Sequence, residues 1–412
     1  MILVKGIGTS TYVTVGRVKK IRKKEDLLDI DGGEIVVMSR ASRDMLSYLR
    51  KAAGVVTDYG GITSHAAIVL RELKIPCIVG TGNATEVILE DTIITVDGKT
   101  GNVYQGFMEI EEEKDLFEVY HPATNIKVNL NIPEIAAEVA PYSDGVGSIR
   151  IENPIIRTGK HPQRLLEEDI LTETIVKGIE GIVNAFYPKP VWFRTFDILS
   201  DELTHLEGCS TGIRESNPLI GFRGIINDLK NFEILKAEFE AVRKVYEQGY
   251  TNIAVKIPFI RDITEYILAK KLLKSTGLKP HKDIKIGISV ETPSSACILD
   301  DFIREGIDFV SIGMSDLTMA ILAVDRRSVK VAKHYNLLHP AVLNTVESVI
   351  RKCTENYIES CVCGYAATNE AIVKKLVEYG ITSISTNPDQ ILKMRKIVEK
   401  IENKLIKEGF ST

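Results

Sequence analysis

Short β-rich runs alternate with long stretches of helical periodicity through the last two thirds of the chain. Each run has the length and apolar content of a buried strand, and each stretch between runs is long enough for a helix. Eight such runs occur in residues 125–412: Ile126–Leu130, Gly145–Arg150, Val191–Arg194, Ile253–Ile257, Ile286–Glu291, Phe309–Gly313, Ser360–Cys363 and Ser383–Thr386. Eight strands that alternate with helices predict an α/β architecture, the (β/α)8 TIM barrel.

The first hundred residues show a different pattern, in which short strands are separated by turns. Strands are expected at Ile2–Lys5, Tyr12–Ile21, Glu34–Met38, Gly54–Thr57, Pro76–Val79, Thr92–Val96 and Asn102–Gln105, and helices at Ala41–Ala52 and His65–Leu73. These elements predict a small β/α domain of its own, residues 1–108. A charged stretch (EIEEEKD) then begins a linker that we place at residues 109–124, ahead of the barrel at residues 125–412.

Composition and charge exclude several classes of protein. Lys and Arg number 52 and Asp and Glu 56, so the net charge of −4 argues against a strongly basic nucleic-acid-binding protein. Apolar stretches such as Leu317–Val324 are far too short to cross a bilayer, and the N-terminal MILVKGIGTS lacks the features of a signal peptide. Six cysteines in 412 residues do not make a disulfide framework. We therefore expect a cytoplasmic protein that binds neither nucleic acid nor a membrane.

The sharpest motif is the sequence GGITSHAA at residues 60–67. Two glycines allow a tight turn, and Thr63 or Ser64 can cap the helix that follows. His65 would then lie in the first helical turn, where free N–H groups and the helix dipole favour an anion. Its imidazole nitrogen is nucleophilic and largely neutral near pH 7, which suits a phosphoryl carrier. An isolated histidine is more often a packing residue, but this context favours the carrier.

Polar or reactive residues end almost every predicted barrel strand, where such barrels hold their catalytic groups. They are Arg150, Arg194, Lys256, Glu291, Ser315, Asp316, Cys363 and Asn387. Two carboxylates at one rim, Glu291 and Asp316, suit Mg²⁺, which binds few protein oxygens. Asp316 could instead cap the helix that follows it, and its pairing with Glu291 is what favours the metal.

Several arginines lie at or beyond the predicted strand ends. Arg150, Arg194 and Arg326 carry guanidinium forks of the kind that bind phosphate and carboxylate groups in pairs of hydrogen bonds. Arg223, in the sequence GFRG, is a weaker fourth candidate. A single arginine usually forms a salt bridge, but several that converge on a carboxylate pair predict a site for an anionic substrate.

The sequence leaves the roles of Cys363 and Lys256 open. Cys363 ends a predicted strand and could be a thiol acid or base, although a buried inert cysteine is more common. The Cys-x-Cys spacing lacks the second pair that a zinc site needs. Lys256 could point into the barrel mouth or pair with a carboxylate. The remaining cysteines are expected to be structural: Cys77, Cys209, Cys297 and Cys353.

Seven segments together make the chain resemble the C-terminal half of phosphoenolpyruvate (PEP) synthase, in the family that includes pyruvate phosphate dikinase and enzyme I of the sugar phosphotransferase system. The segments are TDYGGITSHAAIVLRELKIPCIVGTGNAT, FRTFDILSDELTHLEG, ESNPLIGFRG, SVETPSSA, SIGMSDLTMAILAVDRRS, VCGYAA and SISTNPD. The resemblance covers nearly the whole chain, and FRTFDILSDE and VGTGNAT are most similar to the synthase branch.

The resemblance implies a swivelling phosphohistidine domain followed by a PEP- and pyruvate-binding barrel. His65 is similar in position to the phosphorylated histidine, and Cys363 to the residue that exchanges a proton at the methyl carbon. Substrate binding is implied for Arg150, Arg194 and Arg326, and Mg²⁺ binding for Glu291 and Asp316. The implied reaction interconverts pyruvate and PEP through phospho-His65, and a homodimer through the barrel is implied as well.

The chain departs from the family pattern at three places near the site. Ser315 stands where the family usually has Asn, and this shorter side chain would change how phosphate is positioned. Tyr365 replaces an acidic or amide residue after Cys-Gly, and residues 151–153 (IEN) replace a Thr-Glu-Phe-like sequence. Thr63 is similar in position to a residue that is phosphorylated in some relatives.

The sequence begins at the swivelling domain, without the ATP-grasp region that charges the histidine of a complete synthase. We therefore expect a separate ATP-grasp subunit or another phosphoryl donor. One alternative is an enzyme I-like carrier that passes phosphate to another protein, which the lack of a helical block before residue 60 disfavours. The other is a divergent non-catalytic homologue acting as a scaffold or regulator, which Ser315 and Tyr365 motivate.

Overall fold

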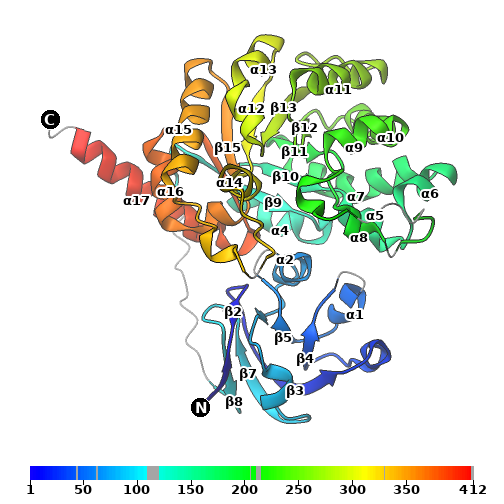
Figure 1. Ribbon diagram of the computed structural model, residues 1–412, viewed down its shortest axis with the longest axis vertical. Helices are drawn as coiled ribbons and strands as arrows, with labels where there is room; N and C mark the ends of the chain where they lie inside the picture. The colour runs from blue at the N-terminus through cyan, green and yellow to red at the C-terminus, as the bar shows by residue number, and fades with distance from the viewer. Residues whose placement is uncertain are drawn as a thin grey trace. The chain divides into compact units, whose positions relative to one another are not determined.

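The computed structural model describes residues 1–42, 45–61, 64–108, 120–204, 206–209, 215–328 and 330–409. The chain divides into two compact units, Met1–Glu118 and Val119–Thr412, each with its own sheet and core (Figure 1). The predicted linker at residues 109–124 falls largely on residues 109–119, which lie outside the described residues. Its limits, and the domain boundaries that depend on them, stay predictions.

The first unit is a mixed sheet in the order β1-β8-β7-β3-β4-β5-β6-β2. Strands β3 to β6 pair in parallel, and the other four pair antiparallel with their neighbours. The strands are β1 (Ile2–Lys5), β2 (Ile7–Gly8), β3 (Val13–Ile21), β4 (Glu34–Arg40), β5 (Gly54–Tyr59), β6 (Cys77–Val79), β7 (Ile93–Asp97) and β8 (Asn102–Gln105). All seven predicted strands are confirmed to within two residues, because their apolar side chains form the buried core of this unit.

The helices of this unit are α1 (Leu46–Leu49), α2 (His65–Glu72) and α3 (Ala84–Val87). The prediction of one helix over Ala41–Ala52 is wrong, because α1 is a single turn. The chain leaves the helix when the Ala52 N–H bonds to Leu49 and the Ala53 N–H bonds to the Glu34 carbonyl at the start of β4. These bonds mark the C-terminal end of the turn, and at the other end Ala41 and Ser42 lie outside any helix.

Within the described part of the second unit, eight parallel strands close into a barrel in the order β9 to β16, with β16 pairing back to β9. They are β9 (Asn125–Leu130), β10 (Val146–Arg150), β11 (Val191–Arg194), β12 (Ile253–Ile257), β13 (Lys285–Val290), β14 (Phe309–Ile312), β15 (Glu359–Cys363) and β16 (Ser383–Thr386). Each predicted run is confirmed to within one residue, and with them the predicted α/β fold.

Helices lie around the outside of these strands (Figure 1). They are α4 (Ala136–Val139), α5 (Glu152–Arg157), α6 (Pro162–Glu167), α7 (Leu171–Phe186), α8 (Ser200–Leu203), α9 (Ile225–Lys230), α10 (Phe232–Glu247), α11 (Ile263–Ser275), α12 (Pro293–Cys297), α13 (Leu299–Glu305), α14 (Met314–Leu322), α15 (Pro340–Glu355), α16 (Glu370–Glu378) and α17 (Ile391–Gly409). Helix α7 shows why they pack, since Ile175, Ile179 and Ile182 lie on one buried face at helical spacing. In the described residues, no helix is both long and apolar enough to span a bilayer.

Alternate residues of each barrel strand point to the interior, and one layer of large side chains lies beneath the C-terminal rim. Trp192 stacks on Phe309 with ring centroids 3.9 Å apart. The ammonium of Lys127 lies 3.7 Å from the Trp192 ring centroid and pairs with Glu359. This layer fills the barrel below the rim, so the residues two positions further along each strand form the floor and walls of the open end.

Gly287 of β13 tests this packing. A Cβ added there would lie 2.4 Å from the Phe309 carbonyl oxygen and 2.5 Å from the Phe309 ring. We expect Gly287→Ala to lower the free energy of unfolding by about 1–3 kcal/mol through overpacking. Urea unfolding followed by the fluorescence of Trp192, the sole tryptophan, measures the barrel specifically.

Gly181, inside helix α7, is the matched control for this substitution. Its added Cβ would meet only Pro133 at 3.5 Å, an ordinary contact. Gly181→Ala should therefore leave stability unchanged or raise it by up to about 1 kcal/mol. Equal stability of the two variants would contradict the tight packing of β13 against β14.

Candidate active site

The C-terminal rim of the barrel collects the predicted site residues of the second unit. The strand register aligns Arg150 with Arg194, and Arg194 with Lys256. The next strands supply the rest: Glu291 directly after β13, Ser315 and Asp316 in the helix after β14, and Cys363 at the end of β15. Because parallel neighbours end at the same edge, six consecutive strands bring polar groups to one rim.

Asp197, on the loop after β11, is the centre of a buried ion-pair cluster. Arg223 donates from Nε to Oδ1 over 2.8 Å and from Nη2 to Oδ2 over 2.6 Å. Arg194 donates from Nη1 to Oδ2 over 3.2 Å and from Nη2 to Glu152. Burial opposes ionisation of Asp197, but the charges of Arg223, Arg194 and Arg150 lower its pKa well below the usual value. This carboxylate therefore joins predicted substrate-binding arginines.

Neither Asp197 nor Glu152 was expected from the sequence as a site residue. The signal that was available is their spacing, since Asp197 follows Arg194 by three residues and Glu152 follows Arg150 by two. Spacing alone does not show that both acids turn toward the same guanidinium group.

Asp316 links two further arginines. Its Oδ2 lies 3.3 Å from Nη2 of Arg223, and its Oδ1 lies 2.8 Å from Nη2 of Arg326. The second contact lacks hydrogen-bond geometry, so the buried Oδ1 has no hydrogen-bond partner. The alternative that Asp316 caps its helix is wrong, because α14 begins at Met314 with Gly313 as the N-cap.

Glu291 lies against the start of α14 and close to other carboxylates. Its Oε2 accepts a hydrogen bond from the Phe259 N–H at 2.8 Å. A Cβ at Gly313 would lie 2.3 Å from Cγ of Glu291, so the glycine makes room for this side chain. Burial, followed by the negative charges of Asp197 and Asp316, raises the pKa of Glu291 to about 7.

Glu291 and Asp316 fit a divalent cation. They influence each other electrostatically, and one buried oxygen of Asp316 lacks a hydrogen bond. A cation would relieve both conditions, and carboxylate oxygens are the hard donors that Mg²⁺ prefers. Among the described residues, no group of three or more His, Cys, Asp and Glu side chains gathers to hold a metal. A two-carboxylate site of the Mg²⁺ type remains compatible with this, since such a site takes its other oxygens from water and substrate.

Cys363 lies beside Ser311 and Lys256 in the barrel interior. Its Sγ is 3.2 Å from Ser311 Oγ and 3.8 Å from the Gly147 carbonyl oxygen. A hydrogen bond with Cys361 lowers the pKa of Cys363 well below the usual value, and the charges of Lys256 and Arg150 act in the same direction. Cys361 is fully buried and its pKa is raised by burial. Of the two cysteines, Cys363 is therefore the one poised as a thiolate.

The structure shows where the residues that depart from the family pattern lie and what they contact. The Ser315 carbonyl accepts a hydrogen bond from the Tyr335 hydroxyl at 3.1 Å, and the residue is half-buried in the first turn of α14. Tyr365 begins the short turn after Cys363 and is 39% exposed. Glu152, within the altered 151–153 segment, pairs with Arg194, so this departure supplies a carboxylate to the cluster.

In the first unit, His65 is the first residue of α2, as predicted. Ser64 caps this helix by accepting a hydrogen bond from the Ala67 N–H at 3.3 Å, and Thr63 lies outside the described residues. The preceding strand is tied down by Asp58, which accepts hydrogen bonds from the hydroxyl groups of Thr81 and Thr85. The backbone here fits the predicted carrier motif, and the role of His65 stays a prediction.

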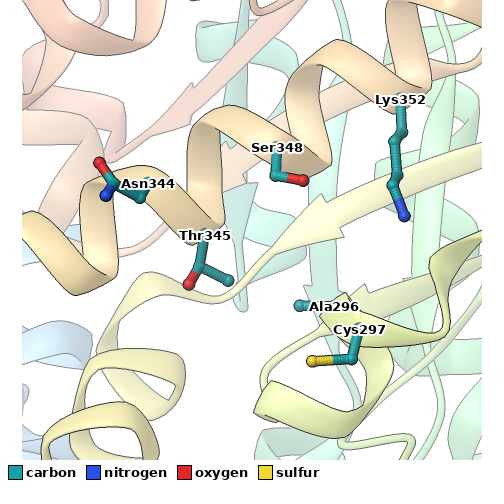
Figure 2. A pocket seen from close by; sticks show the side chains of 6 residues that line it. All are labelled: Ala296, Cys297, Asn344, Thr345, Ser348 and Lys352. Atoms are coloured by element: carbon teal, nitrogen blue, oxygen red, sulfur yellow. The ribbon is translucent and has the colours of Figure 1, made fainter.

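A separate pocket lies between helices α12 and α15 (Figure 2). Its volume is about 330 Å³, and it is lined by Ala296, Cys297, Asn344, Thr345, Ser348 and Lys352. All six residues come from helices outside the barrel, and none was predicted as a site residue. We place the candidate chemistry at the rim, where the charged and nucleophilic groups converge.

Two family models together match almost the whole chain. Residues 12–101 match the mobile domain of PEP-utilising enzymes, and residues 108–403 match their PEP-binding domain. The chain belongs to the family of PEP-utilising enzymes. The resemblance inferred from the motifs is thereby confirmed.

Curated members of the PEP-utilising enzymes are similar over nearly all of this chain. It is 43% identical to a probable phosphoenolpyruvate synthase of Archaeoglobus fulgidus over 99% of its length, and 40% identical to a phosphoenolpyruvate synthase of Pyrococcus furiosus over 98%. It covers 55% and 51% of those proteins, so the chain spans about half the length of these relatives. Among solved structures, a malate synthase of Haloferax volcanii is similar at 12% identity and a TM-score of 0.44, over 70% of this chain and 76% of that one.

The ion-pair cluster around Asp197 makes a stability prediction. Asp197→Asn would leave two buried guanidinium groups without their shared counter-charge, and we expect a loss of about 3–5 kcal/mol in the free energy of unfolding. Urea unfolding followed by Trp192 fluorescence measures it. The control is Glu247→Gln, which breaks the exposed Arg243–Glu247 pair and should change stability by no more than about 0.5 kcal/mol. A change as small as the control's would show that Asp197 does not hold the cluster together.

Proposed function

We propose that this chain interconverts pyruvate and PEP through a phosphohistidine at His65, as the phosphotransfer part of a PEP synthase. The observation that carries the proposal is the convergence of arginines, two carboxylates and the Cys363 thiol at one end of the barrel. Membership of the PEP-utilising family and similarity to proteins named phosphoenolpyruvate synthase support the same reaction.

The barrel residues would act on pyruvate as follows. The Cys363 thiolate removes a methyl proton, so that the C–H bond breaks, an S–H bond forms and the electron pair becomes the enolate. Arg150, Arg194 and Arg326 hold the carboxylate and the incoming phosphoryl group through paired hydrogen bonds. The enolate oxygen then attacks phosphorus, the P–O bond forms, and the P–N bond to His65 breaks. The electron pair of the P–N bond stays on the His65 nitrogen, which takes up a proton to restore neutral His65, and Cys363 gives its proton back to solvent. PEP leaves, and the reverse sequence charges His65 from PEP.

Charge balance supports Mg²⁺ as the cofactor. The rim arginines, Arg150, Arg194, Arg223 and Arg326, are matched by four carboxylates, Glu152, Asp197, Glu291 and Asp316. These carboxylates offset much of the attraction that the arginines would exert on a phosphate ester, and a further cation would restore it. Glu291 and Asp316 would hold Mg²⁺, which supplies charge stabilisation for the enolate and phosphoryl oxygens when bound. Ser315, beside Asp316, would contribute a hydroxyl in place of the longer amide.

We propose that ATP-dependent charging of His65 belongs to an ATP-binding unit beyond these 412 residues, as a separate subunit or as another segment of a longer chain. The greater length of the similar synthases supports a second unit. A homodimer through the barrel remains part of the proposal. The half-reaction with PEP requires neither the ATP-binding unit nor ATP, and it therefore tests the chain by itself.

Incubation with PEP and Mg²⁺ should place one acid-labile phosphoryl group on the chain and release pyruvate. The adduct should be absent from His65→Ala, because the nitrogen nucleophile is lost. Intact-protein mass spectrometry measures the adduct, and a coupled pyruvate assay measures the product. A folded chain that forms no adduct would overturn the proposal and favour the scaffold alternative. Onward transfer to a small carrier protein would favour the enzyme I-like alternative.

Substitution of either proposed metal ligand should raise the Mg²⁺ requirement of this half-reaction. We expect Glu291→Gln and Asp316→Asn each to increase the half-saturating Mg²⁺ concentration by about tenfold or more, since even indirect supports of a metal site cost that much. Asp300→Asn is the control, because Asp300 pairs with Lys352 away from the rim. An unchanged Mg²⁺ dependence in both rim variants would remove them from the metal site.

A further inference from the structure

Lys256 is a charged residue buried in the middle of a barrel strand. It is 2% exposed, and its Nζ donates a hydrogen bond to the Gly147 carbonyl oxygen at 2.8 Å. The described residues provide no carboxylate ion pair for it, although a buried ammonium normally needs one. Lys256 takes no part in the proposed proton and phosphoryl transfer steps. The burial of its ammonium group therefore needs a reason of its own.

The groups nearest to Lys256 lead to Cys363. Ser311 Oγ lies 3.5 Å from Lys256 Nζ and 3.2 Å from Cys363 Sγ, so this hydroxyl bridges the two. Cys363 Sγ also lies 3.8 Å from the same Gly147 carbonyl oxygen that accepts from Lys256. A shared acceptor on β10 and a bridging hydroxyl on β14 connect the ammonium on β12 with the sulfur on β15.

Several other charged groups act on Lys256. Burial lowers the pKa of Lys256, the Arg194 guanidinium lowers it further, and the sulfur atoms of Cys363 and Cys361 and the Glu291 carboxylate oppose that change. Cys363 is the opposing group with the largest effect. Together with the Ser311 bridge, this makes the sulfur of Cys363 the candidate countercharge for the buried ammonium.

We propose that Lys256, bridged by Ser311, is a positioning residue that holds Cys363 as a thiolate and so prepares it to accept the methyl proton. The inference rests on the proposed function for the role of Cys363 in proton transfer. When the C–H bond breaks and the S–H bond forms, the negative charge passes from sulfur to the enolate while Lys256 stays an ammonium. The net charge of the site is then the same before and after the step, which limits its electrostatic cost.

The test measures the acidity of Cys363 without requiring turnover. The full chain is alkylated with iodoacetamide across a pH series, and peptide mass spectrometry reads the rate at Cys363 alone. Lys256→Met removes the charge, and Lys256→Gln removes the charge but keeps a hydrogen-bond donor. Both should raise the pH midpoint of alkylation by about one to three units, the usual effect of a neighbouring opposite charge. Ser311→Ala should raise it by less.

A matched control comes from the same barrel. Lys189 also donates to backbone carbonyls, those of Ala140 and Ser143, but at the opposite end of β11. Lys189→Met should leave the midpoint unchanged, and Cys363→Ser should abolish the signal. Exchange of the pyruvate methyl protons with deuterium should slow at pH 7 in the Lys256 variants and recover as the pH rises.

Two outcomes would overturn the inference. One is an unchanged midpoint in folded Lys256→Met and Lys256→Gln, particularly if Cys361→Ala shifts it instead, since Cys361 is the rival cause. If neither Lys256 variant folds, an unchanged midpoint in Ser311→Ala overturns it. If His65 does not accept phosphate, the pH midpoints of Cys363 alkylation are unaffected. A failure of the proposed function can therefore be told apart from a failure of this inference.

Discussion

The Asp197 carboxylate, buried between Arg194 and Arg223, is the contact on which the arrangement of the rim depends. A guanidinium group can be buried at acceptable cost only when its hydrogen bonds and charge are matched. Asp197 does this for two arginines at once, and Arg223 reaches on to Asp316, which also contacts Arg326. The loop after β11, the segment around Arg223 and the first turn of α14 are thereby held as one charged network.

The barrel interior below the rim determines how strongly these charges act. The Lys127, Trp192 and Phe309 layer fills the space beneath the site, so the groups above it have little access to water from below. Electrostatic effects are larger in such surroundings. This explains why Glu291 is harder to ionise than usual while Asp197 and Cys363 are easier to ionise. Burial is the main cause of the raised pKa of Glu291, the charges of Arg223 and Arg194 outweigh burial and lower the pKa of Asp197, and a hydrogen bond with Cys361 is the main cause of the lowered pKa of Cys363.

The proposed Mg²⁺ site and the proposed thiolate base depend on different electrostatic effects at the rim. The carboxylates of Glu291 and Asp316 repel each other, and a bound Mg²⁺ would relieve that repulsion. Lys256 has the sulfur of Cys363, and not a carboxylate, as its neighbour through Ser311. Its positive charge would favour the thiolate form of Cys363, the form that accepts a proton from carbon. The same rim can thus stabilise negative charge on the substrate and keep its base deprotonated.

Strand positions, the barrel and the residues at the strand ends follow from the sequence, because the apolar runs and the reactive residues that end them are local features. The single-turn α1 (Leu46–Leu49), where a helix from Ala41 to Ala52 was expected, shows the limit of such local evidence. The sequence likewise could not predict which groups the site residues would contact. Arg223 meets Asp197 across 26 residues, and Lys256 meets Gly147 across 109. By itself the sequence indicated most of the chemical groups that reach the rim, although not Asp197 or Glu152. Only the tertiary structure decided which charges become neighbours, because closure of the barrel brings distant strands together and burial makes their pairing obligatory.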